Sequence, residues 1–145
     1  MKTLQFTTFH IGDDLFGVNT KQVQEILHYQ AITPVSLVPE HVRGLLNLRG
    51  QIVTVIDLRN LFGLPHVDDE TFRMFLVVQV EEESICLLVD SMHTIVSVQN
   101  DQLLPPPGSV EDLTARYIRE VCQVDDDDLL LILDLERVLD LQEQA

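Results

Sequence analysis

Two short apolar runs on either side of Arg49-Gly50 give the clearest hydrophobic pattern in the chain. The first covers residues 44–48, and the second covers residues 51–57 and is rich in valine and isoleucine. β-Branched residues favour strands, and glycine adopts a positive φ without a steric penalty. The pattern therefore predicts a β-hairpin whose tight turn carries a cation. Asp57 can cap a short helix directly after the hairpin, and Gly63 can end that helix.

Alternating apolar and polar positions predict further strands. Residues 6–18 are typical of a first hairpin with its turn at Gly12-Asp13-Asp14. Residues 21–27 predict a short turn or helical piece that leads into another short strand. The apolar run at residues 129–133 predicts a strand, and the leucine and valine spacing over residues 134–142 predicts a C-terminal helix.

Two stretches of the chain recur later in the sequence. Residues 9–26 are similar to residues 78–95 at a constant shift of 69 positions, and residues 55–62 are similar to residues 132–139 at a shift of 77. Such recurrence indicates duplication of a small β unit, which has too little core to be stable alone.

The duplication predicts how the chain is organised. We expect one domain over residues 1–145, mainly β, with two small five-stranded barrels packed side by side, short helices and a C-terminal helix. The expected halves are residues 6–66 and 72–141. Exchange of end segments between the two barrels stays open at this stage.

Charge and composition exclude several classes of function. Nine Lys and Arg residues stand against 24 Asp and Glu residues, which gives a formal net charge of −15. A field of this sign repels nucleic acids and anionic membrane surfaces. The sequence shows neither a signal peptide nor an apolar run of the roughly 18–20 residues that span a membrane, so we expect a cytoplasmic protein without membrane insertion. Against this acidic background, Arg43, Arg49 and Arg59 form a local positive island.

The sequence carries no recognisable catalytic or cofactor motif. It lacks the nucleophile elbow of hydrolases and the glycine-rich loops that hold phosphate groups. Cys86 and Cys122 are predicted to be buried reduced thiols, and the five histidines lack the paired spacing of metal ligands. Four aspartates at residues 125–128 admit a calcium site, but a solvated turn fits them better because the alternating ligands of a calcium loop are missing. We expect no catalytic residue, metal or cofactor.

The central hairpin and its flanks carry a longer signature. Residues 47–50 read Asn-Leu-Arg-Gly, residues 55–59 read Val-Ile-Asp-Leu-Arg, residues 62–64 read Phe-Gly-Leu, and residues 23–26 read Val-Gln-Glu-Ile. In this order and spacing the sequence resembles the CheW family of bacterial chemotaxis coupling proteins over residues 6–141. The resemblance implies two SH3-like β-barrels with a hydrophobic seam between them. It also implies a non-enzymatic scaffold or adaptor.

The resemblance further implies two protein partners. They are the cytoplasmic tip of a methyl-accepting chemoreceptor and the regulatory domain of the histidine kinase CheA, which would hold the protein at membrane receptor arrays. Arg49 is the principal candidate contact. Asn47 and Gly44 precede it on the same strand, where the small glycine would permit close approach of another chain. The remaining candidates match positions that line or border a receptor-helix groove: Val23, Glu25 and Ile95. Three neighbouring residues are expected in the core instead: Ile26, Leu27 and Val96.

Two other interpretations remain open from the sequence. A coupling protein of the same fold could control type IV pili or another output, which the sequence does not separate from flagellar chemotaxis. A small enzyme or a ligand-binding β-barrel is the more distant alternative. A deep polar pocket with convergent ionisable groups would favour that alternative.

Overall fold

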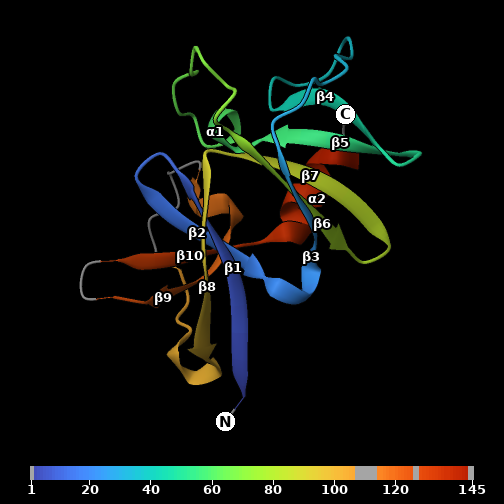
Figure 1. Ribbon diagram of the computed structural model, residues 1–145. Helices are drawn as coiled ribbons and strands as arrows, with labels where there is room; N and C mark the ends of the chain where they lie inside the picture. Colours follow the sequence, from blue (N-terminus) through green and yellow to red (C-terminus); the bar gives the residue numbers. More distant parts are fainter. Residues whose placement is uncertain (1, 107–113, 126–127, 144–145) are drawn as a thin grey trace.

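The computed structural model describes residues 2–106, 114–125 and 128–143, which form two five-stranded β-sheets (Figure 1). Sheet 1 consists, in spatial order, of β8 (Ser91–Gln99), β1 (Thr3–Ile11), β2 (Asp14–Asn19), β10 (Leu129–Leu133) and β9 (Ile118–Gln123). Sheet 2 consists of β3 (Val23–His28), β6 (Met74–Val80), β7 (Glu83–Val89), β5 (Gln51–Asp57) and β4 (Val42–Leu48). The predicted fold class, mainly β with two five-stranded units, is confirmed.

Short helices connect and follow the strands. They are the α-helices α1 (Leu58–Leu61) and α2 (Leu135–Glu143) and the 3₁₀ turns η1 (Thr20–Gln22), η2 (Asn100–Gln102) and η3 (Thr114–Tyr117). The Asp57 side chain accepts a hydrogen bond from the Arg59 N–H at 3.0 Å, which caps α1 as the sequence predicts. The predicted C-terminal helix is also present as α2.

The two sheets do not follow the two halves of the sequence. Sheet 1 takes β1 and β2 from the first half and β8, β9 and β10 from the second. Sheet 2 takes β3, β4 and β5 from the first half and β6 and β7 from the second. Each half therefore places its first two strands in one sheet and its other three strands in the other sheet, so both sheets combine strands from both halves.

The strands of both sheets share the same register. In sheet 1, Leu131 of β10 pairs in parallel with Phe16 of β2, and in sheet 2, Thr54 of β5 pairs in parallel with Ile85 of β7. Leu131 follows Thr54 by 77 positions, and Ile85 follows Phe16 by 69 positions. These are the two shifts that recur in the sequence. The parallel strand pairs of the two sheets therefore occupy corresponding positions.

Each sheet curls until its two edges meet. The chain that follows β3 forms a bridge between Thr33 and Leu45 of β4, with backbone hydrogen bonds of 2.9 and 2.8 Å. The chain that follows β8 and η2 forms the counterpart bridge between Leu104 and Val121 of β9, again at 2.9 and 2.8 Å. These bridges close each sheet into a small barrel.

Apolar side chains fill three separate clusters because alternate residues of a strand face opposite sides of its sheet. On β7, for example, Cys86 and Leu88 point into the sheet 2 barrel, whereas Ile85 and Leu87 point to the other side. The interior of the sheet 1 barrel holds Phe6, Leu15, Val98, Cys122, Leu130 and Ile132. The largest cluster joins both sheets and the two α-helices, and it forms the seam of the molecule.

Two local predictions around β3 are wrong. The helical turn is confined to Thr20–Gln22, and residues from Val23 onward form a strand that pairs with β6. Ile26, expected in the core, is 44% exposed, because β3 is an edge strand and a bulge between Val23 and Glu25 sets which residues face inward. Leu27 faces inward and packs on the sheet 2 interior.

Candidate functional site

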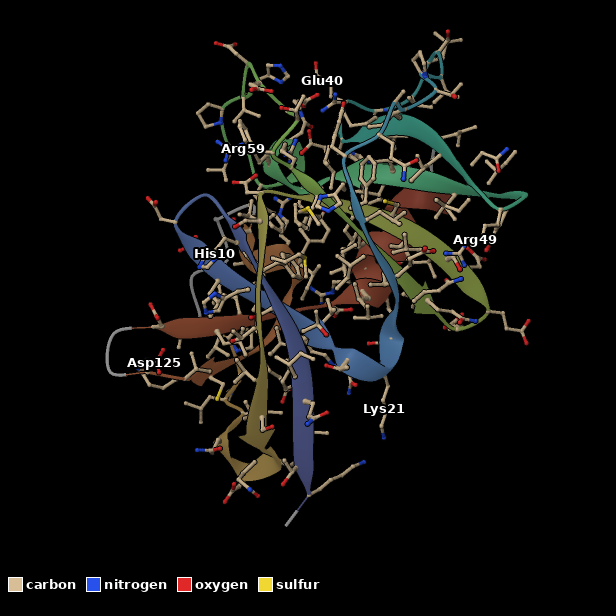
Figure 2. All side chains as sticks on the ribbon, viewed as in Figure 1. His10, Lys21, Glu40, Arg49, Arg59 and Asp125 are labelled. Atoms are coloured by element: carbon tan, nitrogen blue, oxygen red, sulfur yellow. The ribbon has the colours of Figure 1, made fainter. Side chains whose placement is uncertain are left out.

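Arg49 lies at the exposed tip of the β4–β5 hairpin (Figure 2). Leu48 pairs with Gln51, so Arg49 and Gly50 form a two-residue turn, with φ values of 52° and 84°. Two positive φ values define the hairpin turn in which asparagine, aspartate or glycine is normally preferred. The Arg49 side chain is 82% exposed, so no packing within the described residues explains why an arginine occupies this position.

The Arg49 guanidinium is directed by a carboxylate on another strand. Nη2 of Arg49 donates a hydrogen bond to Oε1 of Glu25 on β3, whose side chain is 23% exposed. An exposed ion pair adds little to stability, since water screens it. Its geometric effect is to bring two of the predicted contact residues together across sheet 2.

Asn47 and Val23 lie in the same sheet as this ion pair. The Oδ1 atom of exposed Asn47 accepts a hydrogen bond from the Gly50 N–H at 3.1 Å and so supports the turn. Val23 is half-buried and packs against the seam. Asn47 therefore stabilises the turn that carries Arg49, whereas Val23 exposes only part of its side chain.

The space beside Gly44 is filled by residues of the same chain. This corrects the interpretation from sequence, in which Gly44 leaves room for another chain. Its φ is +143°, and a Cβ atom at this position would lie 2.1 Å from the Thr33 carbonyl oxygen and 2.9 Å from Ile32 Cγ2. The close approach that requires glycine is thus made by residues of the same chain, in the bridge that closes sheet 2. Gly44 is buried and forms no free contact surface.

Ile95 lies on β8, the edge strand of sheet 1, and is 58% exposed. Among the described residues no hydrogen bond, ion pair or strand pairing joins it to Arg49 or Glu25, so the predicted residues form a cluster on sheet 2 and a separate position on sheet 1. The counterpart of Ile95 in sheet 2 is Ile26, which is exposed as well. The shift of 69 positions that relates Ile95 to Ile26 is the sequence signal that assigns the two residues to equivalent positions.

The predicted positive island is largely neutralised. Arg43 donates hydrogen bonds to both carboxylate oxygens of Glu70, at 2.6 and 2.7 Å, and to Asp57 at 3.0 Å. Arg59 donates to Asp90 at 2.6 Å and is 15% exposed. Of the three arginines in the island, only Arg49 extends its charge into solvent.

A buried ion pair that the sequence did not reveal lies at the centre of this network. Arg73, only 4% exposed, donates to both carboxylate oxygens of Asp57, at 2.9 and 3.2 Å. Burial is the largest single effect on the Asp57 carboxyl and opposes its ionisation, but the hydrogen bonds and charges of Arg73 and Arg43 together outweigh it and lower its pKa. Neither Arg73 nor Glu70 belongs to a motif, so no sequence signal identifies them.

The network predicts a pH-dependent contribution to stability from Glu70. Hydrogen bonds from Arg43 lower the pKa of Glu70 below its ordinary 4.5, although burial opposes them. A carboxyl with a lowered folded pKa stabilises the protein above its unfolded pKa and loses that effect as pH falls through the folded pKa. We expect Glu70→Gln to lower the free energy of unfolding by about 2 kcal/mol at pH 7, and the difference from wild type to shrink between about pH 5 and pH 3.

Urea unfolding of both proteins across this pH range measures the difference. Glu82→Gln, at an exposed turn position, is the matched control and should stay within about 0.5 kcal/mol of wild type throughout. A wild-type advantage over Glu70→Gln that persists unchanged at pH 3 would contradict the prediction.

The described residues form no metal-binding cluster, and Cys86 is not placed as a reactive thiol. No group of three or more His, Cys, Asp or Glu side chains among them could hold a metal ion, and Asp126 and Asp127 of the aspartate run lie outside the described residues. Cys86 is fully buried, and burial raises the pKa of its thiol, which disfavours the reactive thiolate. No helix among the described residues is long and apolar enough to cross a membrane.

Comparison with known proteins supplies the family. The sequence model described as the CheW-like domain matches residues 5–143. The chain belongs to the CheW family. A CheW relative, the chemotaxis protein CheW of Treponema pallidum, is 27% identical over 143 residues, which cover 96% of this chain and 84% of the relative. The probable chemotaxis protein CheW of Rhizobium etli is 31% identical over 121 residues, 83% of this chain and 78% of the relative.

A solved CheW structure has the same fold. The scaffolding protein TtCheW from Thermoanaerobacter tengcongensis superposes with a TM-score of 0.82 at 26% sequence identity. The superposition covers 91% of this chain and 89% of that protein. Both the sequence signature and the two-sheet architecture therefore identify this chain as a CheW-like protein.

Proposed function

We propose that this chain is a non-enzymatic adaptor that couples methyl-accepting chemoreceptors to the histidine kinase CheA. One surface would bind the cytoplasmic tip of a receptor and another would bind the regulatory domain of the kinase. Coupling then arises because one assembly holds both partners. The signal passes as a change in the relative stability of the states of that assembly.

Exposed Arg49 is the observation that carries the proposal. It occupies a turn position that favours asparagine or glycine, and its side chain is 82% exposed rather than packed. Unfavourable backbone geometry that packing does not require points to a function for the side chain. Membership of the CheW family, whose relatives are named as chemotaxis proteins, supports partners from a chemotaxis system.

Co-sedimentation of the purified chain with its cognate kinase and a receptor-tip fragment tests the proposal. We expect the three proteins to sediment together and the kinase activity of the assembly to depend on this chain. If the chain co-sediments with neither protein at micromolar concentrations, the adaptor function is wrong.

Arg49→Glu should weaken this assembly while the fold stays intact. Reversing a surface charge usually changes stability by about 0.5 kcal/mol or less, whereas like charges brought together across an interface can weaken binding by several kcal/mol, more than about tenfold in affinity. The Arg49 variant also places a carboxylate beside Glu25 of β3, so its thermal unfolding must be measured alongside sedimentation.

Arg137→Glu is the matched control. Arg137 is likewise exposed, at 62%, and likewise has a carboxylate partner, Asp134, but it lies on α2. We expect this variant to assemble like wild type. Equal loss of assembly in both variants would mean that the change in net charge, and not the position of Arg49, weakens assembly.

A further inference from the structure

The two barrels have equivalent ends, each marked by an arginine in a bulge. In sheet 2, Arg43 is the extra residue of a bulge on β4, between Val42 and Gly44. In sheet 1, Arg119 is the extra residue of the same bulge on β9, between Ile118 and Glu120. The internal duplication therefore places an arginine at the corresponding point of each barrel.

Next to these arginines the backbone is also the same. The Asp57 N–H donates to the His41 carbonyl at 2.8 Å, and the Asp134 N–H donates to the Tyr117 carbonyl at 2.7 Å. Each aspartate then caps the helix that follows, α1 in one case and α2 in the other. The two ends can thus be compared residue by residue.

In sheet 2 the corresponding end holds the turn that precedes β6, in which the Arg73 N–H donates to the Glu70 carbonyl at 2.9 Å. Glu70, just before β6, receives two hydrogen bonds from Arg43, at 2.6 and 2.7 Å, and one from the Tyr29 hydroxyl at 3.2 Å. A bidentate arginine–carboxylate pair of this kind is among the stronger polar contacts in proteins. This turn shows what the arginine of such a bulge can bind.

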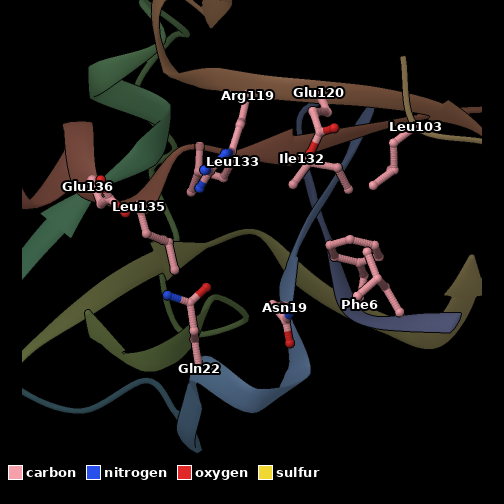
Figure 3. Close-up of a pocket in the computed structure, with 11 residues that line it drawn as sticks. Phe6, Asn19, Gln22, Leu103, Arg119, Glu120, Ile132, Leu133, Leu135 and Glu136 are labelled. Atoms are coloured by element: carbon pink, nitrogen blue, oxygen red, sulfur yellow. The ribbon is translucent and has the colours of Figure 1, made fainter. Parts of the chain in front are cut away.

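In sheet 1 the corresponding end is open. A pocket of about 190 Å³ lies there, with Phe6, Leu103 and Ile132 as its apolar floor and Arg119 at its rim (Figure 3). β2 ends at Asn19, and Asn19 and Gln22 of η1 line the pocket on this side. Residues 3–5 of β1 consequently pair with β8 on one side and have no β2 partner on the other.

Arg119 lacks the partner that Arg43 has. It is exposed and has no hydrogen bond or ion pair with another described residue. An adjoining pocket, which shares Leu4 and Asn19 with the first, is lined by a second cation, Lys21. The rim also carries two carboxylates, Glu120 and Glu136, so a ligand needs a directed contact to Arg119 rather than negative charge alone.

We propose that this open end of sheet 1 binds a peptide segment of a partner protein, whose carboxylate side chain pairs with Arg119 as Glu70 pairs with Arg43. An adjacent apolar side chain of the segment fills the pocket floor, and its backbone runs beside the unpaired edge of β1. The proposal adds a docking site beyond the Arg49 surface and does not depend on the identity of the chemotaxis partners.

The probe is a peptide with the sequence of residues 66–73, His-Val-Asp-Asp-Glu-Thr-Phe-Arg, blocked at both ends, because this segment carries the glutamate that pairs with Arg43 in sheet 2. Amide NMR shifts of the isotopically labelled protein should change at Leu4, Phe6, Leu103 and Arg119. Arg119→Ala should weaken binding at least about fivefold, since a hydrogen-bonded ion pair is lost. Arg116→Ala, an exposed arginine that does not line the pocket, is the matched control and should bind like wild type.

A peptide with glutamine in place of its glutamate separates a specific pair from general attraction. It should bind wild type as weakly as the original peptide binds Arg119→Ala, and it should show no further loss on that variant. Three results overturn the proposal: absence of shifts at the pocket at millimolar peptide, equal affinity for wild type and Arg119→Ala, or shifts at Tyr29 and Arg43 instead. The last result would mean that the peptide displaces its own copy in sheet 2.

Discussion

Asp57→Asn is expected to lower the free energy of unfolding by about 3–5 kcal/mol. Asp57 is 4% exposed and is the counter-ion of Arg73, which is equally buried. Removing one partner of a buried pair leaves the other charge uncompensated in a medium that solvates it poorly. Arg73 would keep two ion pairs, with Glu70 and with Asp90, but both have long nitrogen–oxygen distances of 3.5 Å. Urea unfolding at pH 7 measures the loss.

Asp134→Asn is the control that the duplication provides. Asp134 occupies the same place in sheet 1, caps α2, and faces Arg137, which is 62% exposed. Asparagine caps a helix about as well as aspartate, so its replacement should lower the free energy of unfolding by no more than about 1 kcal/mol, from loss of the exposed ion pair. If both substitutions are equally destabilising, the buried pair with Arg73 does not account for the contribution of Asp57 to stability. Adding Arg73→Met to Asp57→Asn should recover part of the loss, because no buried charge then lacks a counter-ion.

The sequence predicts those features of the fold that depend on local pattern. The β4–β5 hairpin, the Asp57 cap and helix α2 follow from apolar alternation, turn chemistry and helical spacing. The duplication predicts two five-stranded units. It does not predict that each half divides between the two sheets after its second strand, because each repeat carries the same pattern whichever sheet its strands join.

The candidate site is predictable only in part for a related reason. Exposure of Arg49 follows from its position in a two-residue turn. The burial of Gly44 depends on residues 32–33, which reach it only when sheet 2 closes. Arg73 is buried because the pairing of β5 with β7 brings Asp57 and the Leu88 carbonyl together around its side chain. Nothing in the neighbouring sequence marks either residue.

Gly44→Ala is expected to destabilise the protein by about 3 kcal/mol or more, and to do so without any partner present. An added Cβ would lie 2.1 Å from the Thr33 carbonyl oxygen, which is a backbone atom with little freedom to move. Relieving the overlap requires the Thr33–Leu45 bridge to open, with loss of two backbone hydrogen bonds. The backbone at φ +143° adds a strain of about 1–3 kcal/mol for a residue other than glycine.

Gly50→Ala separates these two effects. Gly50 also has a positive φ, +84°, but a Cβ there would meet nothing within 4 Å. It should therefore show only the backbone strain, about 1 kcal/mol. Urea unfolding of both variants decides between the two roles considered for Gly44. If Gly44→Ala is no less stable than Gly50→Ala yet fails to assemble with receptor and kinase, the glycine serves a partner contact rather than the closure of sheet 2.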